Sequence, residues 1–383
     1  MAAGVTERPE IVLGLEDVYV KESRICLVDG ERGRLLYVGY DIRDLAEHSS
    51  FEETSFLLWN QRLPRADELL TFRRALGEAR AVPEELMDFL RKLPRTTLPI
   101  DALRSAVSLL ASYDPEVADA SRDANLRKAL RLTAKVATLV AAYHRTQQGK
   151  RPISPDPERS HAEDFLRMLT GKEPDPLDAR TMDVALILHA DHSLAASTFA
   201  SIVAASTLAD LYSTIVAAIA TLKGPLHGGA NEQALRMLLK IGSPANANPF
   251  VEKALSQKEK VPGFGHRVYK NFDPRALILQ EYSRKLGERS GDMTLFDTAL
   301  AVQESMLRNL QAKRVYPNVD FYSGITFYLL GLPPEVFTPI FTVARVPGWT
   351  AHCLEYWQTN RIIRPLDLYV GPTEAKYVPI DRR

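Results

Sequence analysis

Apolar residues recur at every third or fourth position along much of this chain, which is the spacing that places them on one face of an α-helix. Within residues 123–143, for example, Leu126, Leu130 and Val140 keep this spacing or sums of it. Comparable patterns, several of them opened by serine, acidic residues or proline, predict further helices over 53–59, 67–80, 83–92, 99–112 and 162–169. We therefore expect an all-α fold.

The N-terminal region alone favours β-strands. Residues 24–28 (RICLV) and 34–38 (RLLYV) are two β-prone runs that flank the glycine-bounded turn 29–33 (DGERG). Two such runs around a short turn are typical of a β-hairpin. We expect a short N-terminal hairpin on an otherwise helical chain.

The most apolar stretch of the chain, residues 181–222, predicts helices that are buried on nearly every side. Alanine and serine are abundant between 195 and 220, and small side chains let helices approach closely in a protein centre or at a subunit interface. The stretch is not expected to span a membrane, because three aspartates and two histidines interrupt it: Asp183, His189, Asp191, His192 and Asp210. The proline-rich and charged segments 146–161 and 171–178 read as surface connections.

Residues beyond Asn231 predict shorter amphipathic helices joined by glycine and proline loops. These helices cover 232–241, 248–257, 275–289 and 295–312, and another is expected over 321–330. We interpret residues 231–331 as a smaller, mobile domain, and residues 1–230 and 332–383 as two segments of a large, dimer-forming domain. A cleft between two such domains is a common place for a small-molecule site.

Composition argues against several classes of function. The 48 basic and 48 acidic residues cancel, so no net field draws the chain to nucleic acid or to an acidic membrane. Two cysteines, Cys26 and Cys353, are too few and too far apart for a disulfide framework or a thiolate zinc site. No apolar signal core opens the chain, and no glycine-rich phosphate loop follows a strand pattern. We expect a cytoplasmic protein without a metal or a dinucleotide.

Three segments rich in glycine and proline carry the candidate chemistry. His227 lies in KGPLHGGANE, where small neighbours leave its imidazole uncrowded; taken alone, it is more simply an incidental histidine after a helix. His266 lies in PGFGHRVYK, shortly before DPR, and Asp320 lies in YPNVDFYSG. In their order and spacing these segments resemble the citrate synthase family. The resemblance is to the compact form of the family and runs from residue 14 to residue 371.

The resemblance implies that acetyl-CoA, oxaloacetate and water are converted to citrate and CoA. Making a carbanion equivalent from a thioester requires a base for the α-proton, a donor to the forming enolate oxygen and a donor to the electrophile. By resemblance, Asp320 is the base, His227 the donor to the acetyl carbonyl and His266 the donor to the keto oxygen of oxaloacetate. From the residues alone, Asp320 could instead be the N-cap of the 321–330 helix, and His266 a packing residue of its loop.

Oxaloacetate has two carboxylates, which guanidinium groups bind through paired hydrogen bonds. The resemblance assigns three arginines to this substrate: Arg275 in DPR, Arg345 in VARVPGW, and Arg364 in RIIRP, which would reach the site of the neighbouring subunit. A homodimer is therefore expected. His192, in HADH, matches a further oxaloacetate contact. His189 and His192 could alternatively share a metal, but no nearby acidic or thiol cluster completes a zinc site.

Coenzyme A would be part of a substrate, and no resident cofactor is expected. The sequence KVPGFG resembles the loop that binds adenine and pantetheine in the family, mostly through backbone amides. The resemblance assigns Lys260, Val261, Gly263 and Gly265 to this loop, and Lys270 to a phosphate. Lys260 could equally be a solvated surface residue.

Two other functions remain compatible with the sequence. With propionyl-CoA as the acyl donor, the same fold and mechanism would produce 2-methylcitrate. The sequence leaves both donors open, because they differ by one methylene, which changes the binding free energy by only about 1 to 3 kcal/mol. Long alanine-rich helices would also suit a helical scaffold that binds partners without chemistry. A scaffold, however, has no use for an aspartate, two histidines and three arginines in matching motifs.

Overall fold

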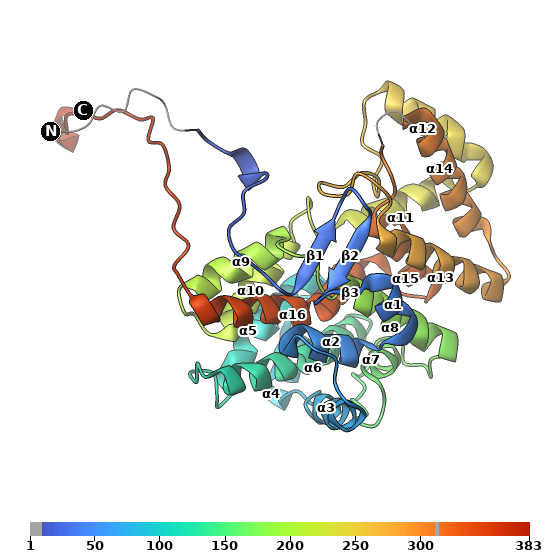
Figure 1. Cartoon of the computed structure of the whole chain (residues 1–383), viewed down its shortest axis with the longest axis horizontal. Helices are drawn as coiled ribbons and strands as arrows, with labels where there is room; N and C mark the ends of the chain where they lie inside the picture. The colour runs from blue at the N-terminus through green and yellow to red at the C-terminus, as the bar shows by residue number, and fades with distance from the viewer. Residues whose placement is uncertain (1–9, 311–313) are drawn as a thin grey trace.

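The computed structural model describes residues 10–310 and 314–383, and within them the chain is built mainly from α-helices (Figure 1). A first group covers residues 42–222: α1 (Ile42–His48), α2 (Phe51–Asn60), α3 (Ala66–Glu78), α4 (Glu84–Lys92), α5 (Pro99–Leu110), α6 (Arg122–Gln147), α7 (His161–Thr170), α8 (Pro176–His189), α9 (Ala196–Ser206) and α10 (Leu211–Leu222). The last long helix, α16 (Phe337–Tyr356), packs among this group. The predicted all-α class is confirmed.

A second group of helices lies between α10 and α16 in the chain: α11 (Ala230–Ile241), α12 (Ala247–Ser256), α13 (Pro274–Ser290), α14 (Thr294–Leu310) and α15 (Val319–Leu329). Helix α15 packs against α11 and α13, and α12 packs against α14. In Figure 1 this group, coloured from yellow to orange, occupies the upper right of the molecule. The predicted smaller domain, 231–331, spans the same helices; its boundary and its mobility stay predictions.

The N-terminal sheet has three antiparallel strands in the order β1 (Cys26–Asp29), β2 (Arg34–Tyr37) and β3 (Tyr40–Asp41). In the register of the first pair, Cys26 lies opposite Tyr37 and Asp29 opposite Arg34. The predicted hairpin is confirmed, and β3 is an addition to it. Leu35 and Tyr37 are fully buried, so one face of the hairpin rests on the helical body.

The first turns of the helices show why they begin where they do. The hydroxyl oxygens of Ser50, Ser121 and Ser160 each accept a backbone N–H of α2, α6 and α7, which satisfies a donor that the helix leaves free. Because of this cap, α2 begins at Phe51, two residues before the predicted start. Pro176 opens α8, where its missing N–H costs nothing, so part of the predicted 171–178 connection is helical.

Several expectations need correction. No helix was expected at α1 or at α16, which contains Pro347 within the helix. His161 was placed in a surface connection, but it is fully buried at the start of α7. The predicted 295–312 helix corresponds to α14, which reaches Leu310; its predicted end at Ala312 lies outside the described residues.

Helix α16 is the central helix of the first group. It contacts α2, α5, α6, α8, α9 and α10, and nearly all of its side chains are buried. Among them is Arg345, which is only 1% exposed. Because burying a charged group is costly without a partner, an arginine in this position marks the surrounding space as a candidate site for an anion.

The two terminal segments extend away from the helical body (Figure 1). The ion pair between Lys21 and Glu355 ties the N-terminal segment to the end of α16. Both segments expose large apolar side chains, which include Leu13, Tyr19, Leu366, Tyr369, Val370 and Tyr377. Exposed apolar side chains in this number are typical of a surface that contacts another molecule.

Among the helices of residues 10–310 and 314–383, none combines the length and the hydrophobicity that a transmembrane helix needs.

Candidate active site

Two loops meet at the start of α15, next to two of the three predicted catalytic residues, His266 and Asp320. The 263–265 loop pairs with the 316–318 loop through two backbone hydrogen bonds of 2.9 Å. Asn318 strengthens this pairing, because its Nδ2 donates to a carbonyl of the first loop at 2.8 Å. His266 directly follows the first loop, and Asp320 lies in the helix turn that follows the second.

Asp320 is the second residue of α15. The N-cap of this helix is Asn318, whose side-chain oxygen accepts the Asp320 N–H at 3.0 Å, so the alternative that Asp320 is itself the N-cap is wrong. Burial raises the pKa of the Asp320 carboxyl to about 6, although the positive charges of Arg275 and Arg345 oppose the shift. A carboxylate with this pKa is largely ionised at neutral pH and is a stronger base than an exposed aspartate.

Arg275 is held rigidly at the start of α13. Its Nε and Nη2 donate to the two carboxylate oxygens of Asp273 at 3.0 and 2.8 Å, and its side chain is 3% exposed. Burial works against the positive charge, but Asp273 more than compensates and raises the pKa of Arg275. The guanidinium is therefore charged, buried and fixed in direction.

Arg345 supplies a second buried guanidinium from α16. Its Nε donates to the carbonyl of His189, and its Cζ lies 4.6 Å from the ring centroid of Phe341. Burial lowers the pKa of Arg345, and the charge of Arg275 adds to this effect. Arg345 and Arg275 thus place two fixed, buried guanidinium groups in this region, and such groups bind carboxylates through paired hydrogen bonds.

His192, His266 and Tyr269 form a cluster beside these arginines. The ring centroids of the two histidines are 5.2 Å apart, edge to face, and the Tyr269 hydroxyl lies 3.4 Å from His192 Nε2. Burial and the nearby Arg275 keep the pKa of His192 well below its usual value, so the ring is neutral. The cluster thus offers uncharged hydrogen-bonding groups next to fixed positive charge.

The alternative of a metal held by His189 and His192 gains no support from the geometry. His189 Nδ1 is engaged by the Ala185 carbonyl at 2.7 Å. Across residues 10–310 and 314–383, no three side chains of histidine, cysteine, aspartate or glutamate gather in a way that could hold a metal ion.

His266 has a defined tautomer. Its Nδ1 accepts the backbone N–H groups of Val268 and Tyr269 at 3.0 and 3.1 Å. Because a backbone N–H can only donate, Nδ1 carries no proton and the neutral ring must carry its proton on Nε2. Burial, with Arg275 second, lowers the pKa of His266 to about 4. At neutral pH His266 is therefore an uncharged hydrogen-bond donor through Nε2.

His227 has the opposite tautomer, fixed by a residue that the sequence reasoning missed. Its Nε2 accepts the backbone N–H of Ser197 at 3.3 Å, and the Ser197 hydroxyl lies 2.8 Å from the same nitrogen. The indole N–H of Trp349 donates to that hydroxyl at 3.2 Å, which leaves the hydroxyl proton free to point at the imidazole. The proton of His227 is thus on Nδ1. Burial lowers the pKa of His227 to about 4, with Arg345 adding to the effect.

Of the remaining predicted residues, Val261 and Gly263 are buried in the loop before His266, and Gly265 directly precedes His266. Arg364 is exposed on the C-terminal segment, as are Lys260 and Lys270 on their loop. Gly263 has a φ of +83°, and a Cβ there would lie 2.8 Å from the side chain of Phe321, so the loop requires glycine at this position.

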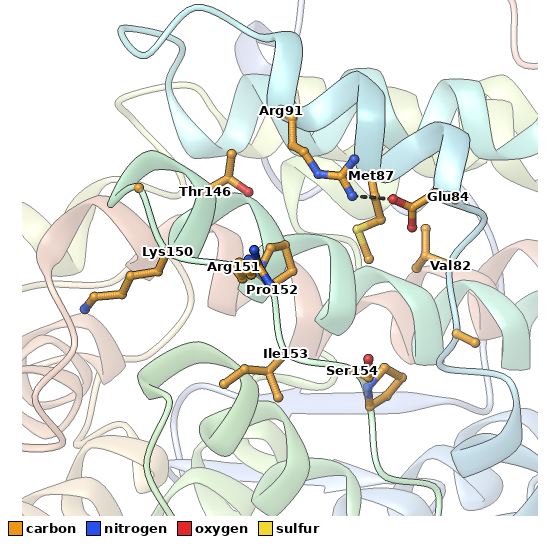
Figure 2. Close-up of a pocket in the computed structure, with 13 residues that line it drawn as sticks. Val82, Glu84, Met87, Arg91, Thr146, Lys150, Arg151, Pro152, Ile153 and Ser154 are labelled. Carbon is orange, nitrogen blue, oxygen red and sulfur yellow. Dashed lines mark hydrogen bonds and ion pairs between the residues drawn. The ribbon is translucent and has the colours of Figure 1, made fainter.

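A cavity of about 780 Å³ lies elsewhere in the structure (Figure 2). It is formed by residues 81–91 and 146–155, and its lining includes Met87, Ile153 and Arg91, which is ion-paired with Glu84. None of the predicted site residues lines it. The candidate active site is therefore identified by its converging polar groups and not by the size of a cavity.

Comparisons with known proteins agree with the family that the motifs resemble. The family described as "Citrate synthase, C-terminal domain" matches residues 14–366. Citrate synthase 2 of Bacillus subtilis is 45% identical, with 97% of this chain and 98% of that protein covered. A less similar relative from the same organism, 39% identical over 94% of this chain and 96% of its own, is named citrate/2-methylcitrate synthase.

Solved structures give the same result. Citrate synthase from Pyrobaculum aerophilum matches with a TM-score of 0.93 and 45% identity, covering 97% of this chain and 95% of that one. A ternary complex of Thermoplasma acidophilum citrate synthase with carboxymethyl coenzyme A and oxaloacetate matches with a TM-score of 0.92 and 35% identity, covering 97% and 99%. Fold, motifs and relatives together show that this chain belongs to the citrate synthase family, whose members are enzymes that transfer acyl groups.

Proposed function

We propose that this enzyme condenses acetyl-CoA with oxaloacetate and water to give citrate and CoA. The observation that carries the proposal is the combination of two buried arginines with two neutral histidines of opposite tautomer and a carboxylate of raised pKa. Each of these groups has a distinct task in an enolate condensation.

Oxaloacetate binds to Arg275, Arg345 and His192. The two guanidinium groups pair with its two carboxylates. His192, which is neutral, adds a hydrogen bond without changing the charge of the site. This arrangement orients the keto group toward His266.

The enolate forms between Asp320 and His227. Asp320 removes a proton from the methyl group of acetyl-CoA, and the electron pair of that C–H bond moves toward the thioester carbonyl. His227 donates its Nδ1–H to the carbonyl oxygen as negative charge grows there. The neutral imidazole can donate this hydrogen bond because its proton is on Nδ1. Ser197, which is hydrogen-bonded to Trp349, holds the other ring nitrogen, Nε2, in place.

Carbon–carbon bond formation then depends on His266. The nucleophilic carbon attacks the keto carbon of oxaloacetate, and the keto oxygen takes up the electron pair of its double bond. The Nε2–H of His266 stabilises this oxygen and supplies a proton for the resulting hydroxyl group. Water then returns a proton to His266 and hydrolyses the thioester of citryl-CoA, and the proton that Asp320 removed leaves with CoA as its thiol, which releases citrate and CoA.

Coenzyme A contacts the loop that precedes His266. In this proposal Lys260, Val261, Gly263 and Gly265 bind adenine and pantetheine, mainly through backbone groups, and Lys270 binds a phosphate. The exposed side chains of Lys260 and Lys270 support contact with a charged ligand, and Gly265, which has a positive φ and room where a Cβ would lie, leaves the backbone approachable. No resident cofactor takes part, because the reaction needs only acid–base chemistry.

The enzyme acts as a homodimer in which Arg364 completes the partner's site. In one chain Arg364 is exposed on a terminal segment that extends from the end of α16, and apolar side chains such as Leu366 and Tyr369 are exposed beside it. A second copy of the chain would cover these apolar side chains, and the oxaloacetate bound in its site would be an anionic partner for Arg364. We also assign the enzyme to the cytoplasm, where its free cysteines, Cys26 and Cys353, would stay reduced.

Steady-state kinetics test the proposal directly. With oxaloacetate present, release of CoA from acetyl-CoA at a higher kcat/KM than from propionyl-CoA is expected. A preference for propionyl-CoA would make the enzyme a 2-methylcitrate synthase with the same mechanism, a reaction named for the relative that is 39% identical. Release of CoA from neither donor would leave only the helical scaffold.

A further inference from the structure

The N-terminal hairpin has no task in the mechanism so far, yet it contacts both of the loops that carry the oxaloacetate histidines. At its tip, the carbonyl of Gly30 accepts the backbone N–H of Lys270 at 3.0 Å. At its base, the side chain of Tyr37 contacts the backbone of Asp191. His266 and His192 lie within a few residues of these two contacts.

At the tip, the hairpin and the loop touch so closely that only glycine fits. A Cβ on Gly30 would lie 2.0 Å from the carbonyl oxygen of Val268, and one on Gly33 would lie 2.7 Å from the carbonyl oxygen of Phe272. Gly30 does not have a positive φ, so the backbone conformation itself would accept a side chain there. The requirement for glycine at position 30 therefore comes from contact with the 268–272 segment.

This segment fixes the orientation of His266. The N–H groups of Val268 and Tyr269 are the two donors to His266 Nδ1, which keep the ring proton on Nε2. In the turn of the hairpin, Gly30 packs against Val268, and its carbonyl accepts the backbone N–H of Lys270. Displacement of this segment would move the two donors and with them the Nε2–H that faces the substrate.

At the base, the hairpin holds the loop of His192. The Tyr37 hydroxyl donates to the Asp191 carbonyl at 2.8 Å and accepts the Asp191 N–H at 3.1 Å. Tyr37 is fully buried, and Asp191 directly precedes His192 in the chain. One rigid hairpin thus connects the two loops from which the neighbouring histidine rings project.

We infer that the β1–β2 hairpin sets the relative position of His266 and His192, and that Gly30 and Tyr37 are positioning residues for oxaloacetate. The inference rests on the proposed function, because it assumes that these histidines bind the substrate. It adds to the machinery that polarises the keto group a structural element about 160 residues away in sequence from His192 and about 230 from His266.

Gly30→Ala is the direct test. The added methyl group must push the 268–272 segment away, so kcat should fall roughly 10- to 100-fold, as expected for a misplaced catalytic donor. The ¹³C signal of oxaloacetate labelled at its keto carbon should move downfield on binding to the wild-type enzyme and less on binding to this variant. A purely structural role of the hairpin would change the melting temperature without changing that signal.

Gly39→Ala is the matched control in the same sheet. Gly39 has a φ of +89° and a Cβ there would meet nothing within 4 Å, so alanine strains the backbone without touching the His266 loop. It should lower the melting temperature and leave kcat and the carbonyl signal as in the wild type. If Gly39→Ala reproduced the losses of Gly30→Ala, the positioning role would be wrong.

Tyr37→Phe tests the base of the hairpin. The variant loses only the hydroxyl and keeps the buried ring, so it tests the inference even if the Gly30→Ala chain does not fold. Tyr37→Phe should raise KM for oxaloacetate and reduce the carbonyl shift. Wild-type values for both, or a folded Gly30→Ala variant with wild-type kcat and shift, would overturn the inference. A wild-type enzyme that leaves the carbonyl signal unmoved would instead contradict the proposed function itself.

Discussion

Asp273 holds the guanidinium of Arg275 through two parallel hydrogen bonds of 3.0 and 2.8 Å. The same carboxylate accepts the backbone N–H of Val319 at 3.1 Å, and Val319 is the residue before Asp320. One buried side chain therefore aligns both the proposed oxaloacetate arginine and the helix turn that carries the proposed base.

Asp273→Asn should weaken oxaloacetate binding more than it weakens folding. The amide keeps the N-cap of α13 but loses the charge and one acceptor, so the guanidinium is free to rotate. We expect KM for oxaloacetate to rise roughly tenfold or more, with a smaller fall in kcat. Asp210→Asn, at the N-cap of α10, is the matched control and should leave both constants unchanged. A KM for oxaloacetate that stays at the wild-type value would show that Arg275 needs no such alignment.

Ser197→Ala should affect the acetyl-CoA half of the reaction. The variant keeps the backbone N–H at His227 Nε2 but loses the hydroxyl that lies 2.8 Å away and links it to Trp349. We expect kcat to fall about tenfold, with KM for oxaloacetate unchanged. Ser201→Ala is a suitable control, because Ser201 is buried in the same helix and its hydroxyl donates to the Thr198 carbonyl. Equal losses in the two variants would indicate a packing effect on α9.

The pH dependence of turnover should report Asp320. Burial raises its pKa to about 6, and only the ionised carboxylate can accept a proton. As the pH falls through 6, kcat/KM for acetyl-CoA should therefore decrease and approach a tenfold loss per pH unit. Burial lowers the pKa of His227 and His266 to about 4, so both histidines stay neutral in this range and do not contribute.

Asp320→Asn separates this base from the rest of the site. The amide has the same size but cannot accept the proton, so we expect kcat to fall by about two to four orders of magnitude with oxaloacetate affinity nearly unchanged. The residual activity should lose the dependence on pH near 6. A variant that retained more than about a tenth of wild-type kcat would exclude Asp320 as the base.

The sequence contained enough local information to predict the helical class, the hairpin and the glycine-rich loops. His227, His266 and Asp320 lie in segments whose glycine and proline content differs from the surrounding helices, so they were visible as candidates. Helix α16 was missed because Pro347 and Gly348 interrupt its pattern, although packing on six other helices keeps it helical.

Contacts between distant segments explain what could not be predicted. Ser197 lies in a stretch of alanine and serine that predicts close helix packing, and nothing local links it to His227, 30 residues later. Tyr37 and Asp191 are 154 residues apart and meet only in the folded chain. The tautomer of His266 is set by backbone N–H groups two and three residues later, whereas that of His227 depends on a hydrogen bond from the distant Ser197, which no local sequence pattern could have assigned.

Hybrid dimers test whether Arg364 serves the partner's site. Arg364→Ala and His227→Ala chains should each be nearly inactive alone. After subunit exchange, a mixed dimer has one site in which both losses meet and one that is intact, so mixing should restore a fraction of the wild-type activity. If exchange occurs and no activity returns, Arg364 acts within its own subunit or outside the chemistry.

Substrate order should follow from the distribution of the site over two groups of helices. Arg275 belongs to the group from α11 to α15, whereas Arg345 belongs to α16 in the other group. If these groups are separate domains, a dianion that pairs with both arginines favours their approach, and this differential contact is what can stabilise a closed state. Oxaloacetate should therefore bind first and create the acetyl-CoA site.

The measurement compares acetyl-CoA affinity with and without a saturating, unreactive oxaloacetate analogue, together with the radius of gyration by solution scattering. We expect tighter acetyl-CoA binding to a more compact particle when the analogue is present, because closure also excludes water from the enolate. Arg275→Ala should abolish the compaction, since the analogue then contacts one group of helices only. Equal affinities and an unchanged radius would show that the site is complete before oxaloacetate arrives, and that neither the predicted mobile domain nor an ordered mechanism is needed.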